Sequence, residues 1–113
     1  MGKANIKPLK DEYGIIKSAK EILPKELWND FIETMAELED NNAHITATYP
    51  KTRLHKVTGS KKSIYRADIK QTSGWRIHIQ FSADKFIKLC DLIPRGDHNR
   101  TLTVIQEKID RYE

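Results

Sequence analysis

The chain has 113 residues, of which 38% are hydrophobic and 32% are charged, and its formal net charge is +4. That length is enough for one hydrophobic core and too short for two, so we expect a single domain over residues 1–113. The lone cysteine, Cys90, excludes an intrachain disulfide and a cysteine-rich zinc site. No apolar run approaches the roughly 18 to 20 residues of a membrane span, and the first residues lack the apolar stretch of a signal peptide. We therefore expect a soluble cytoplasmic protein.

Basic charge is concentrated in the second part of the chain. Residues 1–45 contain six Lys and nine Asp or Glu, a balance of −3. Residues 46–113 contain fourteen Lys or Arg and seven acidic residues, a balance of +7. Such a field attracts polyanions, of which nucleic acid is the commonest. On charge alone, an ordinary soluble basic protein is an equally good interpretation.

Two amphipathic segments follow a polar lead at residues 1–10, which fits an edge strand or disorder equally well. Helical spacing of apolar residues from Ile15 to Leu23 predicts a first helix, which Pro24 ends because proline cannot extend a helix from inside it. The pattern restarts from Leu27 to Leu38 and predicts a second helix. Together they predict a helical hairpin over about residues 11–40. The second helix carries a row of carboxylates that we interpret as a solvated face: Glu26, Asp30, Glu33 and Glu37.

Extended segments dominate the middle of the chain. Arg53–Val57 is a candidate short strand, and Ser63–Lys70 and Trp75–Phe81 alternate in polarity with period two. Lys85–Ile93 is a further strand, and a short helix is expected over about residues 100–112. The predicted fold class is α+β, with the N-terminal helical hairpin packed on a small antiparallel sheet of three to four strands at about residues 53–93.

The register of the two central strands follows from their apolar sides. The apolar residues meet on one face in the pairs Ile69–Trp75, Ala67–Ile77 and Tyr65–Ile79. On the other face this register sets Arg66 opposite His78 and Asp68 opposite Arg76. A pairing shifted by two residues would instead place His78 opposite Asp68. Either arrangement gives one polar surface, which is a plain ion-paired outer face or a functional one.

No motif for a metal or a cofactor is present in the sequence. The four histidines, at positions 44, 55, 78 and 98, are dispersed, and there is no glycine-rich phosphate loop or nucleophile elbow. Chemistry would therefore depend on Arg, Lys and His alone. Cleavage of RNA by its own 2′-hydroxyl suits that set, because guanidinium groups stabilise the charged phosphorane while imidazole moves protons.

Several short motifs point to a known family. Leu54–Gly59, Ile64–Ile69, Gly74–Gln80 and Ile93–Arg95 follow a helical hairpin, and this order resembles the RelE/ParE superfamily of bacterial toxins from toxin–antitoxin pairs. The resemblance covers roughly residues 11–100. It implies a small antiparallel sheet flanked by two N-terminal helices. The RelE-like branch, which we favour, consists of endoribonucleases that cut messenger RNA on the ribosome. The ParE branch has the same fold but inhibits DNA gyrase without cleaving nucleic acid.

The resemblance also implies roles for individual residues. The arginine of the Gly-aromatic-Arg strand corresponds to Arg76, the arginine after the last strand to Arg95, and the nearest candidate proton donor or base beyond it is His98. Our hypothesis is that Arg76 and Arg66 hold the scissile phosphate, while His78 or His98 handles protons. The basic residues expected to grip the RNA backbone are Arg53, Lys56, Lys61, Lys62 and Arg100.

The expected partners are messenger RNA, the ribosome and a cognate antitoxin that covers the basic face. No metal or cofactor is expected. The alternative hypotheses are a member of the same fold that inhibits gyrase, a module that binds nucleic acid without cleaving it, and a member that binds only protein.

Overall fold

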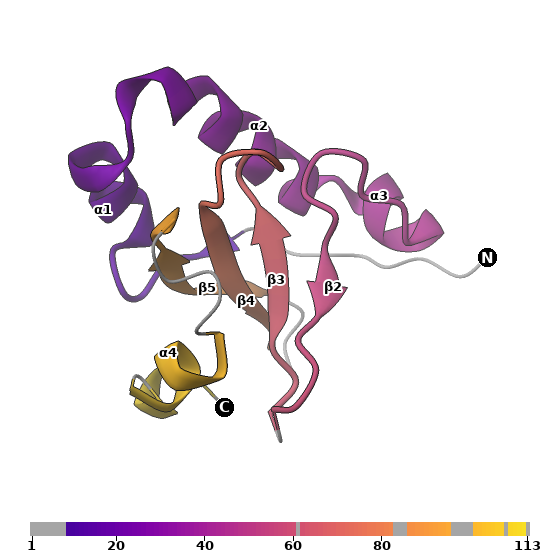
Figure 1. The fold of residues 1–113 in the computed structure, drawn as a ribbon. Coiled ribbons are helices and arrows are strands. Elements are labelled where there is room, and N and C mark those ends of the chain that lie inside the picture. The colour runs from indigo at the N-terminus through magenta and orange to yellow at the C-terminus, as the bar shows by residue number, and fades with distance from the viewer. Residues whose placement is uncertain (1–8, 61, 83–85, 96–100, 108, 113) are drawn as a thin grey trace.

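The protein has an α+β fold built on a five-stranded mixed sheet. The computed structural model describes residues 9–60, 62–82, 86–95, 101–107 and 109–112. In spatial order the strands are β1 (Leu9–Lys10), β5 (Ile87–Ile93), β4 (Arg76–Phe81), β3 (Tyr65–Asp68) and β2 (His55–Lys56) (Figure 1). β1 runs parallel to β5, and the other neighbouring strands are antiparallel. The predicted antiparallel sheet of three to four strands is therefore wrong. A two-residue strand such as β1 is too short to produce an alternating pattern.

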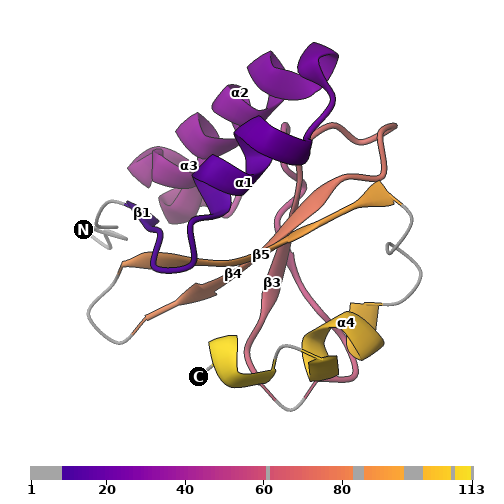
Figure 2. The ribbon, with the colours of Figure 1, turned by 90° about the vertical axis from the view of Figure 1, so that its left-hand side faces the viewer.

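Helices lie on both faces of the sheet. One face carries α1 (Ile15–Ile22), α2 (Trp28–Glu39) and α3 (Asn41–Thr46), whereas α4 (Thr101–Glu107) lies on the other (Figure 2). The predicted simple helical hairpin is also wrong, because α3 follows α2 directly. Asp40, expected to end the helical region, accepts a hydrogen bond from the backbone N–H of Asn42 at 3.0 Å and so caps the N-terminus of α3.

The ends of α1 follow from local chemistry. Both carboxylate oxygens of Asp11 accept backbone N–H groups at the start of this helix, from Ile15 at 2.6 Å and Ile16 at 3.0 Å. Its C-cap is Leu23, immediately before Pro24, so the predicted end of the first helix is confirmed. Within the described ranges, no helix combines the length and the apolar character needed to cross a membrane.

The main core lies between the sheet and helices α1 and α2. Ile77 and Ile79 from β4 pack there against Ile15 and Phe31 from the helices. The predicted stripe on α2 is only partly buried, because Ile32 keeps 64% of its surface exposed and Trp28 is also exposed. The stripe is wider than the surface that the sheet and α1 can cover.

The predicted register of β3 and β4 is confirmed. Arg66 pairs with His78 and Asp68 pairs with Arg76, as the apolar sides require. Between β4 and β5 the register shifts at a β-bulge, where Cys90 is the extra residue. Cys90 faces a smaller apolar cluster under α4, with Val57, Ile64, Ile105 and Tyr112.

Candidate nucleic-acid interface

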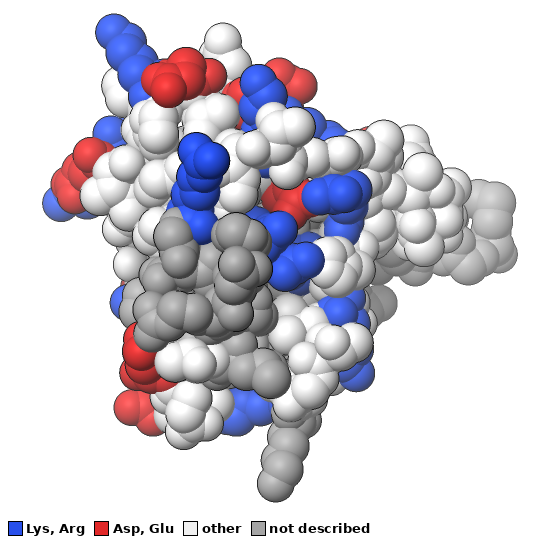
Figure 3. Space-filling model, viewed as in Figure 1, with Lys and Arg blue, Asp and Glu red and all other residues white. Residues whose placement is uncertain are grey.

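A row of polar residues crosses the sheet on the face opposite α1 and α2. In register, His55 on β2 pairs with Arg66 on β3, Arg66 with His78 on β4, and His78 with Asp91 on β5. On the β4–β5 half of this row, which we call the covered half, Tyr112 and Arg111 of the C-terminal segment contact His78 and Asp91. On the β2–β3 half, which we call the open half, His55 is exposed. On the open half, basic side chains gather around an acidic group (Figure 3).

Asp68 is the centre of the open half. Its side chain is 3% exposed, and its Oδ2 accepts from Arg53 through Nη2 at 2.6 Å and Nε at 2.8 Å. Its Oδ1 accepts from Nε of Arg76 at 3.3 Å. One buried carboxylate thus fixes two guanidinium groups that come from a loop and a strand. Arg66 lies on the same face, close enough for the charges of Arg76, Asp68 and Arg53 to act on it, so the described part of the cluster joins three guanidinium groups and the carboxylate of Asp68.

The loop that carries Arg53 is held by α2. Glu37 accepts backbone N–H groups from Lys51 and Thr52, both at 2.9 Å, and the Thr52 hydroxyl at 2.6 Å. Asp30 pairs with the ammonium of Lys51. Two carboxylates of the row that we interpreted as a solvated face therefore position the loop. Sequence spacing gave no sign of this, because it does not show which loop returns to α2.

Arg66 lies in an unfavourable electrostatic environment. Burial lowers the pKa of its guanidinium, the neighbouring charges of Arg76 and Arg53 add to this, and Asp68 opposes it. Its Nε is shielded from solvent and has no hydrogen-bond partner among the described residues. An anion near Arg66 would relieve both features.

His78, a predicted proton carrier, is fully buried. Its Nδ1 lies 3.0 Å from the hydroxyl of Tyr112. Burial raises the pKa of Tyr112, and the nearby Asp91 adds to the shift, so the phenol keeps its proton. The structure therefore brings Arg66 of the open half close to Arg76, at the start of β4, and separates His78 from solvent.

The remaining predicted residues fall in three places. Lys56 is exposed at the β2 edge, next to the cluster. Arg95 is exposed just beyond β5, where a Cβ on Gly74 would come within 2.9 Å of its Cγ. Lys62 donates to the backbone carbonyl of Tyr112 at 2.7 Å and so contacts the C-terminal segment. The predicted residues that lie outside the described ranges are Lys61, His98 and Arg100.

His55 is a candidate that the sequence analysis missed. It is exposed on β2, directly opposite Arg66, and its Nδ1 lies 2.7 Å from the backbone carbonyl of Arg53. His55 and Arg66 also line a pocket of about 180 Å³ with Lys56, Val57 and Thr58. The sequence signal that could have pointed to His55 was the predicted short strand at Arg53–Val57. Its pairing partner, and hence the position of His55, could not be inferred from one short segment.

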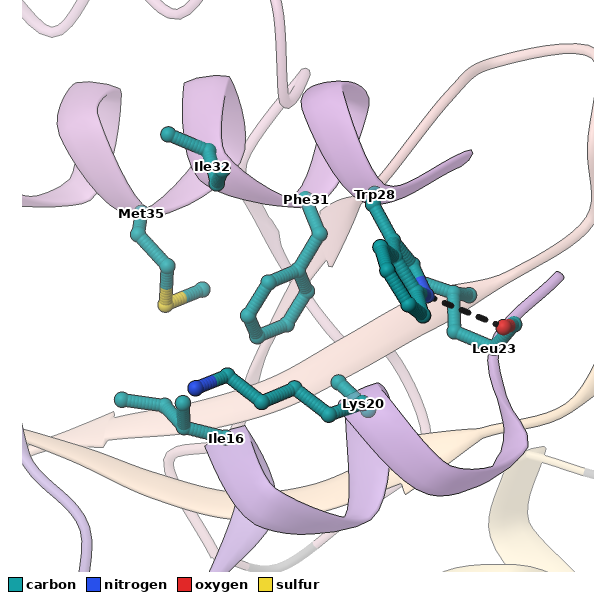
Figure 4. Close-up of a pocket in the computed structure, with 8 residues that line it drawn as sticks. Ile16, Lys20, Leu23, Trp28, Phe31, Ile32 and Met35 are labelled. Carbon is teal, nitrogen blue, oxygen red and sulfur yellow. Dashed lines mark hydrogen bonds between the residues drawn. The ribbon is translucent and has the colours of Figure 1, made fainter. Parts of the chain in front are cut away.

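A second concave surface lies between α1 and α2, away from the polar row. This groove has a volume of about 500 Å³ and is lined by Ile16, Ala19, Lys20, Leu23, Trp28, Phe31, Ile32 and Met35. Among the described residues Lys20 is the charged one that lines it, and its side chain extends along the groove between Ile16 and Phe31 (Figure 4). The indole N–H of Trp28 donates to the carbonyl of Leu23 at 3.3 Å, which fixes one end of the groove.

The described residues contain no group of three or more His, Cys, Asp or Glu side chains arranged to hold a metal ion. Comparisons of the chain with the models of known protein families, with curated proteins and with solved structures find no match. The candidate interface therefore rests on its own geometry, and membership of the RelE/ParE superfamily is a proposal.

Proposed function

We propose that this chain is the ribonuclease toxin of a toxin–antitoxin pair and that it binds and cleaves messenger RNA at the open half of the polar row. The observation that carries the proposal is the convergence of Arg53, Arg66 and Arg76 around the buried carboxylate of Asp68. Such a cluster suits a phosphodiester, because guanidinium groups match phosphate oxygens in geometry as well as in charge.

The reaction proposed is transesterification by the RNA itself. The 2′-oxygen attacks the adjacent phosphorus as a water molecule takes its proton, the bond from phosphorus to the 5′-oxygen breaks, and the 5′-oxygen takes a proton from water. The products are a 2′,3′-cyclic phosphate and a 5′-hydroxyl. Arg76 and Arg66 would stabilise the negative charge that develops on the phosphorane. Asp68 holds Arg76 in place, so the donor is positioned before the substrate arrives.

A cleavage assay tests the proposal, with messenger RNA free in solution in EDTA and with messenger RNA on translating ribosomes in magnesium. The wild-type chain should cleave, and Arg76→Ala should slow cleavage by about 10²- to 10³-fold, the usual effect of removing one donor to a transition-state anion. Lys70→Gln, an exposed lysine outside the cluster, is the matched control and should cleave normally. Full activity of Arg76→Ala would remove that residue from the mechanism. Inhibition of gyrase without RNA cleavage would instead favour the ParE-like alternative.

The apolar groove supports a second function, which is binding of the antitoxin. We propose that an amphipathic helix of the antitoxin lies between α1 and α2, with its apolar residues against Phe31 and Ile32. An acidic residue on that helix would meet Lys20, which is exposed at the groove beside apolar lining residues. The exposed Ile32 and Trp28 are the kind of surface that a partner covers.

The test for the groove uses the protein encoded by the neighbouring reading frame. Ile32→Glu and Lys20→Glu should each weaken its binding by at least about tenfold, since each places a charge against an apolar or acidic partner surface. Lys17→Glu makes the same charge change on an exposed part of α1 outside the groove and should bind as the wild type does. Unchanged binding of Ile32→Glu would exclude the groove as the docking surface.

A further inference from the structure

The pocket at the β2–β3 edge has the chemistry of an anion site. It is lined by His55, Lys56, Val57, Thr58 and Arg66 and has a volume of about 180 Å³. This is smaller than the roughly 300 Å³ of the smallest pockets for drug-sized ligands, so it suits a group of the size of a phosphate with its sugar. Lys56 and Arg66 supply positive charge, and Thr58 supplies a hydroxyl.

Arg66 indicates which kind of group the pocket takes. Its shielded Nε has no hydrogen-bond acceptor among the described residues, although a buried donor without a partner costs free energy. Burial lowers the pKa of Arg66, the like charges of Arg76 and Arg53 add to this, and an anion would offset that repulsion. A phosphate in the pocket that Arg66 lines would supply this negative charge.

His55 adds a feature that a simple anion site does not need. Its Nδ1 lies 2.7 Å from the carbonyl oxygen of Arg53, and a carbonyl oxygen can only accept a hydrogen bond. The proton of the neutral ring is therefore on Nδ1, and Nε2 carries the lone pair. A nitrogen acceptor beside a phosphate site can accept a hydrogen bond from a ribose 2′-hydroxyl, the group that distinguishes RNA from DNA.

We propose that this pocket binds a ribose phosphate and selects RNA over DNA. Arg66 donates to the phosphate oxygens, and Nε2 of His55 accepts from the adjacent 2′-hydroxyl. The inference builds on the proposed function, because it names the part of the RNA that the interface recognises, but binding in the pocket can be measured without any cleavage.

Titration of the purified chain with adenosine 3′-monophosphate, 2′-deoxyadenosine 3′-monophosphate and inorganic phosphate, followed by NMR of the histidine rings, tests the proposal. The ribonucleotide should bind about 2- to 10-fold more tightly than the deoxyribonucleotide, the range expected for one additional hydrogen bond. Inorganic phosphate should bind more weakly than either. Equal affinities for the two nucleotides, or phosphate binding as tight as that of the ribonucleotide, would overturn the proposed recognition of the sugar.

Two variants separate the contact of Arg66 with phosphate from the contact of His55 with the 2′-hydroxyl. Arg66→Gln should weaken both nucleotides by about tenfold or more, because a charge-assisted contact to phosphate is lost. His55→Phe should weaken the ribonucleotide to the level of the deoxyribonucleotide. Lys70→Gln removes the same charge as Arg66→Gln from the far end of β3 and should bind both as the wild type does. If Arg66→Gln bound both nucleotides with wild-type affinity, the proposal that this pocket binds a ribose phosphate would be overturned.

The cleavage assay distinguishes failure of this inference from failure of the proposed function. Selective binding of the ribonucleotide without RNA cleavage would support the pocket and reject the ribonuclease. Cleavage that persists unchanged in both His55→Phe and Arg66→Gln would reject the pocket as the place where the substrate binds and remove Arg66 from the proposed mechanism, whereas the ribonuclease activity itself would stand.

Discussion

The two halves of the polar row have the same kind of sequence and different surroundings. His55 and Arg66 lie on the open half, whereas their in-register neighbours His78 and Asp91 are buried beneath the C-terminal segment. On the covered half, Tyr112 and Arg111 contact the polar side chains and make them part of the structure. On the open half, His55 is exposed and Arg66 lines a pocket. What covers a polar strand face thus decides whether its side chains are bound within the protein or face solvent.

Removing the carboxylate of Asp68 should have the largest effect on stability. Asp68→Ala is expected to lower the free energy of unfolding by about 3–5 kcal/mol, since it breaks both ion pairs of a buried carboxylate. Urea denaturation measures this. Glu33→Ala, which removes an exposed carboxylate of α2, should change stability by no more than about 0.5 kcal/mol. Equal effects of the two variants would mean that the open half has no internal support from Asp68.

Tyr112→Phe examines the covered half. Losing the hydrogen bond between Tyr112 and His78 should cost about 0.5–1.5 kcal/mol near pH 7, measured by urea denaturation. RNA affinity should not change, because neither group lies on the open half. A loss of RNA affinity in a folded Tyr112→Phe protein would show that the two halves act together.

Tyr112→Phe should also change how the stability of the protein depends on pH in the alkaline range. Because burial raises the pKa of Tyr112, the folded chain keeps this proton while the unfolded chain loses it above about pH 10. The stability contribution is complete below pH 10 and is lost as the pH rises further, by up to about 1.4 kcal/mol per pH unit. The stability of Tyr112→Phe should therefore fall less steeply above pH 10. Parallel alkaline curves for the two proteins would contradict this origin of the shift.

Arg53→Gln tests the open half through the salt dependence of RNA affinity. Its side chain is 52% exposed, so the variant should lose at most about 1 kcal/mol of stability. If Arg53 contacts one phosphate of single-stranded RNA, the slope of log affinity against log salt should become shallower by about 0.7. Lys20→Gln carries the same charge change on the opposite side of the sheet and should leave the slope unchanged.

The smallest effect is expected at Lys62, on the border between the halves. Its contact with the carbonyl of Tyr112 predicts that Lys62→Gln loses about 0.5–1 kcal/mol of stability and keeps the wild-type salt slope for RNA. A shallower slope would assign Lys62 to the open half, in agreement with the role that the sequence analysis gave it.

The sequence predicted what depends on alternation along single strands. The register of β3 and β4, including the Arg66–His78 and Asp68–Arg76 pairs, follows from requiring the apolar sides to meet. The α+β class and the end of the first helix were predicted for the same local reasons.

Features that depend on contacts between distant segments were not predicted. β1 pairs with β5 from the other end of the chain, and Glu37 binds a loop fourteen residues away from it in sequence at Lys51. The burial of His78 depends on Tyr112, thirty-four residues later. Periodicity indicates which side of a strand is polar, but it carries no information about which segment returns to cover that side.

The bulge at Cys90 explains why β5 did not alternate in the sequence. The side chains that pack toward α1 and α2 are Ile87 and Leu89 before the bulge and Leu92 after it, so the extra residue changes the parity of the strand. Without that residue, Asp91 would turn toward the apolar core. Apolar residues are therefore required at odd-numbered positions of β5 before Cys90 and at even-numbered positions after it. A single inserted residue thus lets one strand serve two chemically different layers.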